Sequence, residues 1–299
     1  MITTGNFVEL LEPGLKKIYG DKYNAWRKEY TEIFDILTSE KSSEEYQGIT
    51  GLGNVSEKQQ GKSVNYSDPQ QGFKTTLTNI TYGLGFIVTK EMAEDDLYNK
   101  INAMPSALAQ SVMNTVETLG GLVLDRAFDS NFAFGDGKEL CATDHPLENG
   151  GTLSNELATP ADLSETSFEQ MTIDVAAFTD GQGLKINAMP QKLIVAQNDN
   201  YTAAKILQSN QEPETGNNAI NPARGILPGG YLVSHFVTDP DAWFVRTNVP
   251  GLICQKRRWP ADMTRDNDFD TENGKFKTTF RLQYGAYDPR SIFGTPGAA

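Results

Sequence analysis

The spacing of apolar residues changes near the middle of the chain. Large apolar side chains occupy every second position over residues 80–88, the period-two pattern of a β-strand. Over 108–127 they recur every three to four positions, as on one face of an α-helix. Glu117 is the only charged residue within 102–124, so this long helix needs burial on several sides. Pro105 lies where the helical pattern begins, so the helix either starts or kinks there.

Two further patterns precede this helix. Aromatic and aliphatic residues recur at helical spacing through residues 1–40, which predicts a helical arm. Residues 46–71 are polar and rich in glycine, which favours short strands joined by loops. We expect residues 62–66 and 73–88 to be the two limbs of one extended hairpin. Because a two-stranded hairpin is marginal in water, it should lie on its own domain or on another molecule.

The second half of the chain mixes helices and strands. Residues 164–179 predict a helix with Ser164 as its N-cap, and Thr166 and Glu169 have the spacing of a capping box. The other predicted elements are a strand at 192–196, a helix at 201–209, a loop at 212–228 and strands at 231–238, 243–247, 252–259 and 276–284. There is no regular β-α-β alternation, so the pattern indicates the α+β class.

Composition limits the functions that the chain can have. It carries 26 Lys and Arg against 39 Asp and Glu, a formal net charge of -13. This balance argues against broad binding to nucleic acid or anionic membranes, although the run 256–258 is a local basic spot. Two cysteines are too few for a disulfide framework, so we expect reduced thiols. The first residues lack a signal-peptide pattern and polar residues interrupt the long helix, so we expect a soluble protein.

The sequence contains no strong catalytic or metal-binding motif. Phosphate-binding glycine loops, the nucleophile elbow and the zinc-protease motif are all missing. A zinc site could use Cys141, His145, His235 and Cys254, but no pair among them has the close spacing of known sites. The simpler interpretation is that His145 orders a turn before a proline. The acidic run 266–272 starts like a calcium loop but lacks its glycine and final glutamate, so we interpret it as a solvated loop.

Several segments resemble the major head subunits of Mu-like tailed phages. One group is Leu-Cys-Ala-Thr-Asp-His-Pro-Leu at 140–147, Gly-Gly-Thr-Leu-Ser-Asn at 150–155 and Asp-Leu-Ser at 162–164. A second group is Asp-Pro-Asp-Ala-Trp-Phe at 239–244 and Arg-Leu-Gln-Tyr-Gly-Ala-Tyr-Asp-Pro-Arg at 281–290, followed by Gly294. Their order and spacing are more specific than any one segment, and the resemblance covers most of the chain.

The resemblance implies the tailed-phage major capsid fold, an α+β architecture with five parts. These are an N-terminal arm at 1–45, an extended β-hairpin loop at 46–88, a spine helix and peripheral domain at 89–189, an axial domain at about 190–250, and return strands of the peripheral domain at 251–299. The spine helix would run over about 104–129. The hairpin loop would reach over a neighbouring subunit, and the axial domain would lie near the five- and six-fold axes.

The resemblance also implies a function. Many copies would assemble as pentamers and hexamers into an icosahedral shell around double-stranded DNA, in a virion assembled in the bacterial host cytoplasm. Because few residues precede the hairpin, the partners would include a separate scaffolding protein, together with a portal and a decoration protein. The packaged DNA would be contacted weakly, since a strongly basic lining would oppose its release. No enzyme activity, cofactor, metal or membrane contact is expected.

Candidate contact residues follow from this interpretation. Phe73, Leu77 and Tyr82 are candidate apolar anchors of the hairpin loop on an adjacent subunit. Lys58 and Lys62 lie in the loop where another branch of the fold crosslinks a lysine to a neighbour's asparagine, but nothing here identifies that asparagine.

Four arginines are candidates for ion pairs between subunits or for contacts to DNA: Arg257, Arg258, Arg281 and Arg290. The alternative is that they are ordinary surface arginines, whose exposed ion pairs contribute little. Two other functions also remain open. An encapsulin-like compartment would enclose an enzyme cargo, which co-purification would reveal. A soluble hydrolase using scattered carboxylates would be a monomer or small oligomer with a pocket.

Overall fold

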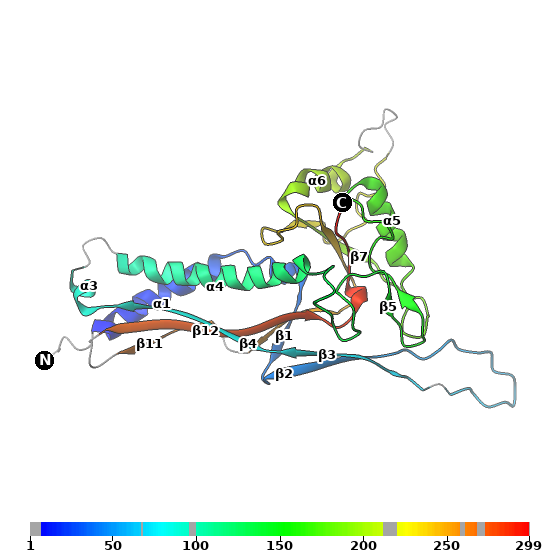
Figure 1. Cartoon of the computed structure of the whole chain (residues 1–299), viewed down its shortest axis with the longest axis horizontal. Coiled ribbons are helices and arrows are strands. Elements are labelled where there is room, and N and C mark those ends of the chain that lie inside the picture. The colour runs from blue at the N-terminus through cyan, green and yellow to red at the C-terminus, as the bar shows by residue number, and fades with distance from the viewer. Residues whose placement is uncertain are drawn as a thin grey trace.

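The computed structural model describes residues 7–66, 68–95, 100–211, 220–257, 261–267 and 273–298. Three parts are visible: a long flat body, a second lobe at one end of the body, and a hairpin loop that projects past this lobe (Figure 1). Helices and strands are mixed without a repeated β-α-β unit, so the α+β prediction is confirmed. None of the helices in the described ranges has both the length and the hydrophobicity of a transmembrane segment.

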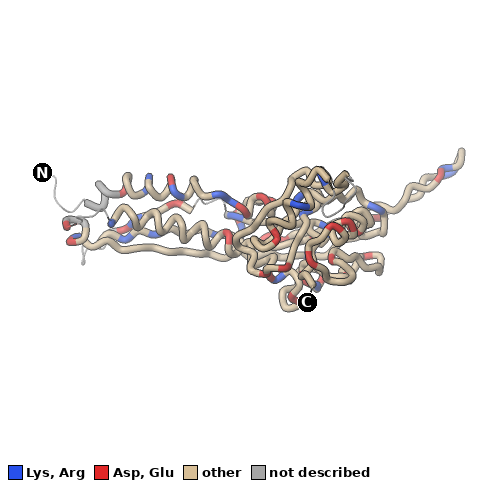
Figure 2. Tube along the Cα trace, turned by 90° about the horizontal axis from the view of Figure 1, so that it is seen from above, with Lys and Arg blue, Asp and Glu red and all other residues tan. Residues whose placement is uncertain are grey.

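The body is a five-stranded sheet with helices packed on it. Its strands are β1 (Asp35–Ser39), β4 (Ile80–Val88), β10 (Leu252–Arg257), β11 (Met263–Asn267) and β12 (Gly274–Ala286). Its helices are α1 (Phe7–Ala25), α2 (Tyr30–Ile33), α3 (Lys90–Glu94) and α4 (Lys100–Asp125). Seen from above, α1 and α4 lie side by side along the body (Figure 2).

β12 organises the sheet of the body because it pairs along both edges. One edge pairs antiparallel with β4, and the other with β11 and then β10, to which β1 adds in parallel. Alternate side chains of β12 are buried, as its period-two pattern predicted. Phe276 and Phe280 stack on Phe86 and Tyr82 of β4, with ring centroids 5.1 and 5.6 Å apart. These cross-strand aromatic pairs help to fix the register of β4 on β12.

α4 confirms the long central helix but begins before the expected position. Leu108, Val112 and Val116 lie on its buried face, as the spacing predicted. The helix starts at Lys100, so Pro105 lies inside it rather than at its first position. Pro105 is itself buried. Burial along α4 outweighs the one backbone hydrogen bond that a proline cannot donate.

The N-terminal segment is helical only in part. α1 and the short α2 agree with the predicted helical arm, and Tyr19 of α1 is buried against the body, where it donates to the Ala261 carbonyl at 2.5 Å. Residues 35–39, which continue the helical spacing, instead form β1. The helical prediction is wrong there because the edge of β10 offers this segment a ladder of backbone hydrogen bonds.

The hairpin differs from the predicted one. β2 (Ser43–Ile49) pairs antiparallel with β3 (Gln71–Thr78), and Thr50 and Gln70 close the base of the loop between them. Residues 62–66, the predicted outgoing limb, belong to that loop and form no strand. Residues 80–88 form β4, which pairs with β12 instead of with the hairpin. The predicted pairing is wrong because the apolar face of β4 finds its aromatic partners on β12.

The second lobe is built on a four-stranded sheet with the order β13 (Ile292–Thr295), β9 (Trp243–Thr247), β7 (Pro190–Val195), β8 (Tyr231–Val233). Leu193 and Val195 of β7 share a core with Phe168 and Trp243, beneath α5 (Glu165–Ala176) and α6 (Asn200–Gln208). Ile194, on the other face of β7, belongs to the core that includes residues of α4. Alternate residues of one sheet therefore join the lobe to the body.

Details of the second lobe refine the sequence predictions. Ser164 caps α5 as predicted, but its reciprocal partner is Ser167 rather than the expected Thr166 and Glu169 pair. The predicted strand at 231–238 ends at Val233, and the strand at 192–196 is confirmed as β7. The short elements are β5 (His145–Pro146), β6 (Thr152–Leu153), η2 (Gln197–Asp199) and η3 (Pro289–Ser291).

Packing also divides the chain differently from the expected boundaries. α5 precedes residue 190 and β13 follows residue 251, yet Phe168 and Phe293 from these elements share the core of the second lobe. The acidic run 266–272 is only partly described: its first residues end β11, which the sequence did not predict, and residues 268–272 lie outside the described residues.

Candidate interaction surfaces

The hairpin loop carries apolar side chains that contact little of their own chain. The exposed members are Ile49, Leu52, Val55, Val64 and Tyr66, and Val55 and Tyr66 are 100% and 94% exposed. Lys58 and Lys62 lie in the same loop. Few hydrogen bonds hold it, among them Asn65 Nδ2 to Ser56 Oγ at 2.9 Å. A protruding loop with exposed apolar residues is suited to contact a second molecule.

The three expected anchors are less available than these loop residues. Leu77 is buried in its own chain and packs over Gly285, so it cannot also serve as an anchor on a neighbour. Tyr82 is partly buried and stacks on Phe280. Phe73, 37% exposed, is the one of the three with substantial free surface.

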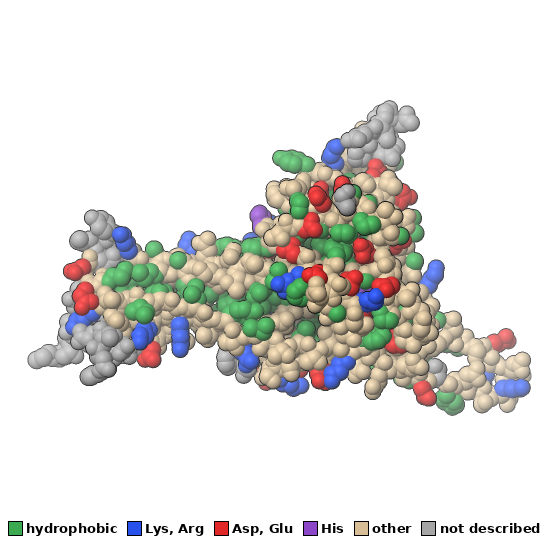
Figure 3. Space-filling model, in the orientation of Figure 1, with side chains coloured by type: hydrophobic (Ala, Val, Ile, Leu, Met, Phe, Trp, Pro, Cys, Tyr) green, Lys and Arg blue, Asp and Glu red, His purple; other side chains and the backbone are tan. Residues whose placement is uncertain are grey.

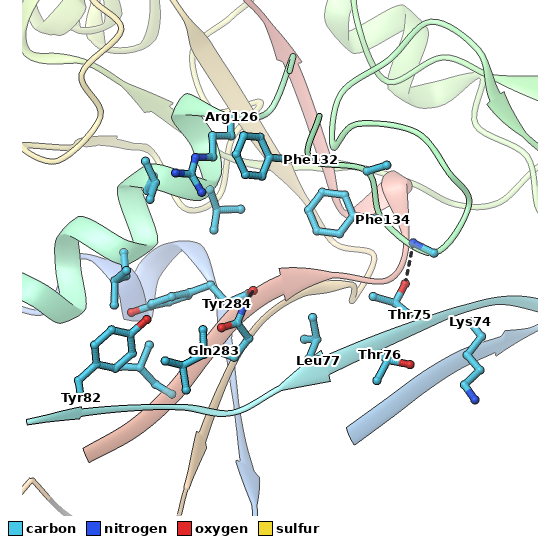
Figure 4. Close-up of a pocket in the computed structure, with 17 residues that line it drawn as sticks. Lys74, Thr75, Thr76, Leu77, Tyr82, Arg126, Phe132, Phe134, Gln283 and Tyr284 are labelled. Atoms are coloured by element: carbon cyan, nitrogen blue, oxygen red, sulfur yellow. Dashed lines mark hydrogen bonds between the residues drawn. The ribbon is translucent and has the colours of Figure 1, made fainter. Parts of the chain in front are cut away.

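A cleft of about 530 Å³ lies at the base of the hairpin (Figure 4). α4, the segment 132–135 and strands β3, β4 and β12 form its walls. The Arg126 guanidinium lies 4.0 Å from the centroid of the Phe132 ring. The backbone N–H of Gly135 donates to Thr75 Oγ1 at 3.2 Å and ties the segment to β3. Apolar side chains gather along the middle of the face shown in Figure 3.

The predicted arginines serve different roles. Arg290 is used within its own chain, because its Nε donates to the Thr179 carbonyl at 2.7 Å and its Nη1 lies 3.1 Å from Asp288 Oδ1. Arg281 is half-buried and donates to the Asn79 carbonyl at 3.4 Å. Arg257 ends β10, and Arg258 lies outside the described residues.

Two glutamates, Glu29 and Glu117, join the N-terminal segment to α4 and to the segment around His235. The backbone N–H groups of Glu29 and Tyr30 donate to the Glu117 carboxylate at 3.0 and 2.9 Å. The Glu29 carboxylate in turn contacts His235, with Oε1 2.6 Å from Nδ1. Burial raises the pKa of Glu117 to about 7, against the lowering effect of the two backbone hydrogen bonds. Lys256 donates to the Tyr30 hydroxyl beside this site.

The candidate zinc ligands do not form one site. His145 Nδ1 lies 2.6 Å from Asp136 Oδ2, while His235 contacts Glu29. Across the described residues, no group of three or more His, Cys, Asp and Glu side chains is placed to hold a metal ion. Cys141 and Cys254 are buried, and desolvation raises the pKa of each thiol.

Asn155 joins three of the motif segments: its own at 150–155 and those at 140–147 and 281–290. It is fully buried, and its Nδ2 lies 2.8, 2.9 and 3.1 Å from the carbonyl oxygens of Leu140, Pro289 and Ile292. Its Oδ1 accepts from the Ala142 N–H at 2.9 Å. These segments therefore meet in space as a structural joint.

Sequence reasoning missed the cleft, the Asn155 joint and the Glu117 site. Only the last had a signal, because Glu117 was the lone charge in an otherwise uncharged helical stretch. The cleft and the Asn155 joint combine segments that are far apart in the chain, which no local pattern reveals.

Comparisons with known proteins give a consistent result. Residues 74–294 match a family model described as phage capsid protein. Among solved structures, the capsid of a native GTA particle is 14% identical, with 92% of each chain covered and a TM-score of 0.57. A virus-like particle from Pyrococcus furiosus is 12% identical, with 95% of this chain and 98% of that chain covered and a TM-score of 0.56.

A third similar structure is the procapsid of bacteriophage JBD30, 13% identical, with 97% of this chain and 75% of that chain covered and a TM-score of 0.52. No curated protein matches the sequence. At these identities the solved structures show a shared fold, and that fold extends over nearly the whole chain.

Proposed function

The chain belongs to the phage capsid protein family, and on that premise we propose that it is the major subunit of a phage head. Many copies close into an icosahedral shell around double-stranded DNA. The observation that carries this proposal is the shared fold over nearly the whole length of a GTA capsid subunit. The family is one of structural proteins, so the chain is not an enzyme and the hydrolase alternative is set aside.

Self-association through the hairpin loop is the mechanism that the geometry favours. The exposed side chains of Val55 and Tyr66 bury apolar surface once the loop lies on a neighbouring subunit. Each contact is small, but a closed shell of pentamers and hexamers engages many at once, so weak contacts add up to a stable particle.

The parts of the chain have separate proposed roles. Residues 1–45 are the proposed N-terminal arm, although α1, α2 and β1 of this range pack as part of the body, and the loop within 46–88 contacts a neighbour. The rest of the body, with α4, is the proposed peripheral domain, and 190–250 contributes the axial domain. Because α5 and β13 share the core of the second lobe, we assign them to the axial domain as well.

Several finer features remain part of the proposal. The resemblance of residues 140–155 and 281–290 supports a Mu-like subfamily. A separate scaffolding protein, a portal and a decoration protein are the proposed partners, and the shell assembles in the bacterial cytoplasm and contacts its DNA weakly. Arg257, Arg258 and Arg281 are the arginines proposed to face neighbours or DNA. An encapsulin-like shell is the alternative, and an enzyme that co-purifies inside the particle would favour it.

Electron microscopy and light scattering of the purified chain test this function, with and without a co-expressed scaffold candidate. We expect closed shells or rings of five and six copies. Replacing residues 51–69 by an Asn-Gly turn should leave a folded chain, as judged by circular dichroism, that does not close into shells.

A variant with Lys58→Arg and Lys62→Arg keeps the loop and its charge, and we expect it to assemble normally. Intact shells from the loop replacement would contradict the role of the loop. A monomer under every condition, with a scaffold present, would contradict the shell function itself.

A further inference from the structure

The cleft at the base of the hairpin differs in charge from the rest of this acidic protein. The chain has 39 Asp and Glu, yet none of the 17 residues that line the cleft is acidic. Its apolar walls come from three places: Leu119, Leu122 and Val123 of α4, Phe132 and Phe134 of the following segment, and Leu77, Ile80 and Tyr82 of the strands. Its volume, about 530 Å³, is in the range of specific binding sites.

Arg126 gives the cleft a cation that no carboxylate of the described residues neutralises. Its guanidinium stacks on the Phe132 ring, 4.0 Å from the centroid, and it forms no ion pair with any of the described residues. Lys74 on the opposite edge differs, because Glu45 lies 2.7 Å from its Nζ. A stacked guanidinium above an apolar floor can bind a carboxylate by donating two parallel N–H hydrogen bonds to it.

We propose that this cleft docks an acidic, apolar peptide segment of another protein, whose carboxylate pairs with Arg126 while its large apolar side chains fill the cleft. A short amphipathic helix or an extended segment provides this combination. The proposal goes beyond the shell function, because it concerns a second protein and can be tested on unassembled subunits.

The hairpin loop of a second copy is a poorer occupant on charge grounds. Residues 51–69 carry Lys58 and Lys62 against Glu57 and Asp68, so the loop has no net charge. Inserting this loop would therefore supply no net negative charge to complement Arg126. An acidic segment has the opposite and complementary charge.

Selection from a displayed library of random peptides of about 12 residues tests the proposal. The library is selected on the wild-type chain and depleted on the Arg126→Glu variant. We expect enriched peptides with at least two large apolar residues and a carboxylate. Synthetic copies, measured by fluorescence anisotropy, should bind Arg126→Glu about tenfold or more weakly than wild type.

Charge reversal and a matched variant make this test specific. Replacing the acidic residue of a peptide by Lys should restore its binding to Arg126→Glu. Arg224→Glu, the same change at an exposed arginine of the second lobe, should leave binding unchanged. Ala133→Glu, at an exposed position on the rim, should weaken binding without altering Arg126.

Three results would overturn the proposal. The first is no enrichment on wild type over Arg126→Glu. The second is enriched peptides that bind both proteins equally, or that do not respond to Ala133→Glu. The third is enrichment of sequences like residues 51–66, which would assign the cleft to a second copy of this chain. Microscopy tests shell formation separately, so failure of this proposal and failure of the shell function can be distinguished.

Discussion

Glu117 occupies the point where the N-terminal segment, α4 and the second lobe meet. Its carboxylate accepts from the backbone N–H groups of Glu29 and Tyr30, which begin α2 and have no partner inside that helix. A residue of one helix therefore caps another. Glu29 extends the connection to His235 through its own carboxylate. Two side chains thus connect three segments that are far apart in the sequence.

Substitution of Glu117 should change how stability depends on pH. Burial raises its pKa to about 7 from the ordinary value of 4.5, so the folded state binds a proton more tightly than the unfolded chain. The resulting stabilisation is complete below pH 4.5 and is lost as the pH rises through 7. We expect Glu117→Gln to flatten this part of the pH profile, by up to about 3 kcal/mol in the free energy of unfolding.

Urea unfolding of wild type and Glu117→Gln between pH 4.5 and 7.5 measures this effect. His235→Asn is the matched variant, because it removes the ionisable side chain that contacts Glu29 and retains Glu117. If Glu117→Gln and wild type lose stability with pH at the same rate, the pKa of Glu117 is not the cause.

At the scale of elements, the local sequence pattern predicts which face of a helix or strand is buried, but not which element packs or pairs with it. The spacing of β12 and α4 follows from their own burial, so both were predicted from sequence. The partner of β4 was not, because an alternating strand can add to any edge that matches its apolar face. β1 and β11 are short and mixed in polarity, so the sequence held no local signal for either strand. The cleft had no local signal because its walls come from segments between residues 74 and 284.

Two neighbouring glycines of α4 test how closely the second lobe approaches this helix. A Cβ at Gly121 would lie 2.2 Å from the Phe236 carbonyl oxygen, while one at Gly120 would lie 3.4 Å from the nearest atom, in the ring of Phe34. We expect Gly121→Ala to lower the free energy of unfolding by about 1–3 kcal/mol through the enforced backbone shift. Gly120→Ala should be neutral or stabilising by up to about 1 kcal/mol, because alanine favours the helix.

Chemical denaturation of the two single variants measures the difference, and Gly120→Ala serves as the control for helix propensity. If the two substitutions changed the free energy of unfolding equally, the Phe236 segment would move away from α4 without loss of stability.

At the scale of the whole molecule, charge and apolar surface act in opposite directions on assembly. Copies with a formal charge of -13 repel one another, while the exposed Val55 and Tyr66 of the hairpin loop gain by burial against a neighbour. Salt shortens the range of the repulsion to about 10 Å at 0.1 M and about 3 Å at 1 M, but hardly affects the apolar contact. Assembly should therefore start at a lower protein concentration in high salt.

Replacing Val55 and Tyr66 together by Ser separates these two contributions. Because both side chains are exposed, the free energy of unfolding should change by no more than about 0.5 kcal/mol. The concentration at which light scattering rises should increase at every salt concentration, while its decrease with added salt should persist, since the charge of the chain is unchanged. Conversely, an unaltered threshold would show that other surfaces supply the apolar contact between copies, and loss of the salt effect would show that charge repulsion does not oppose assembly.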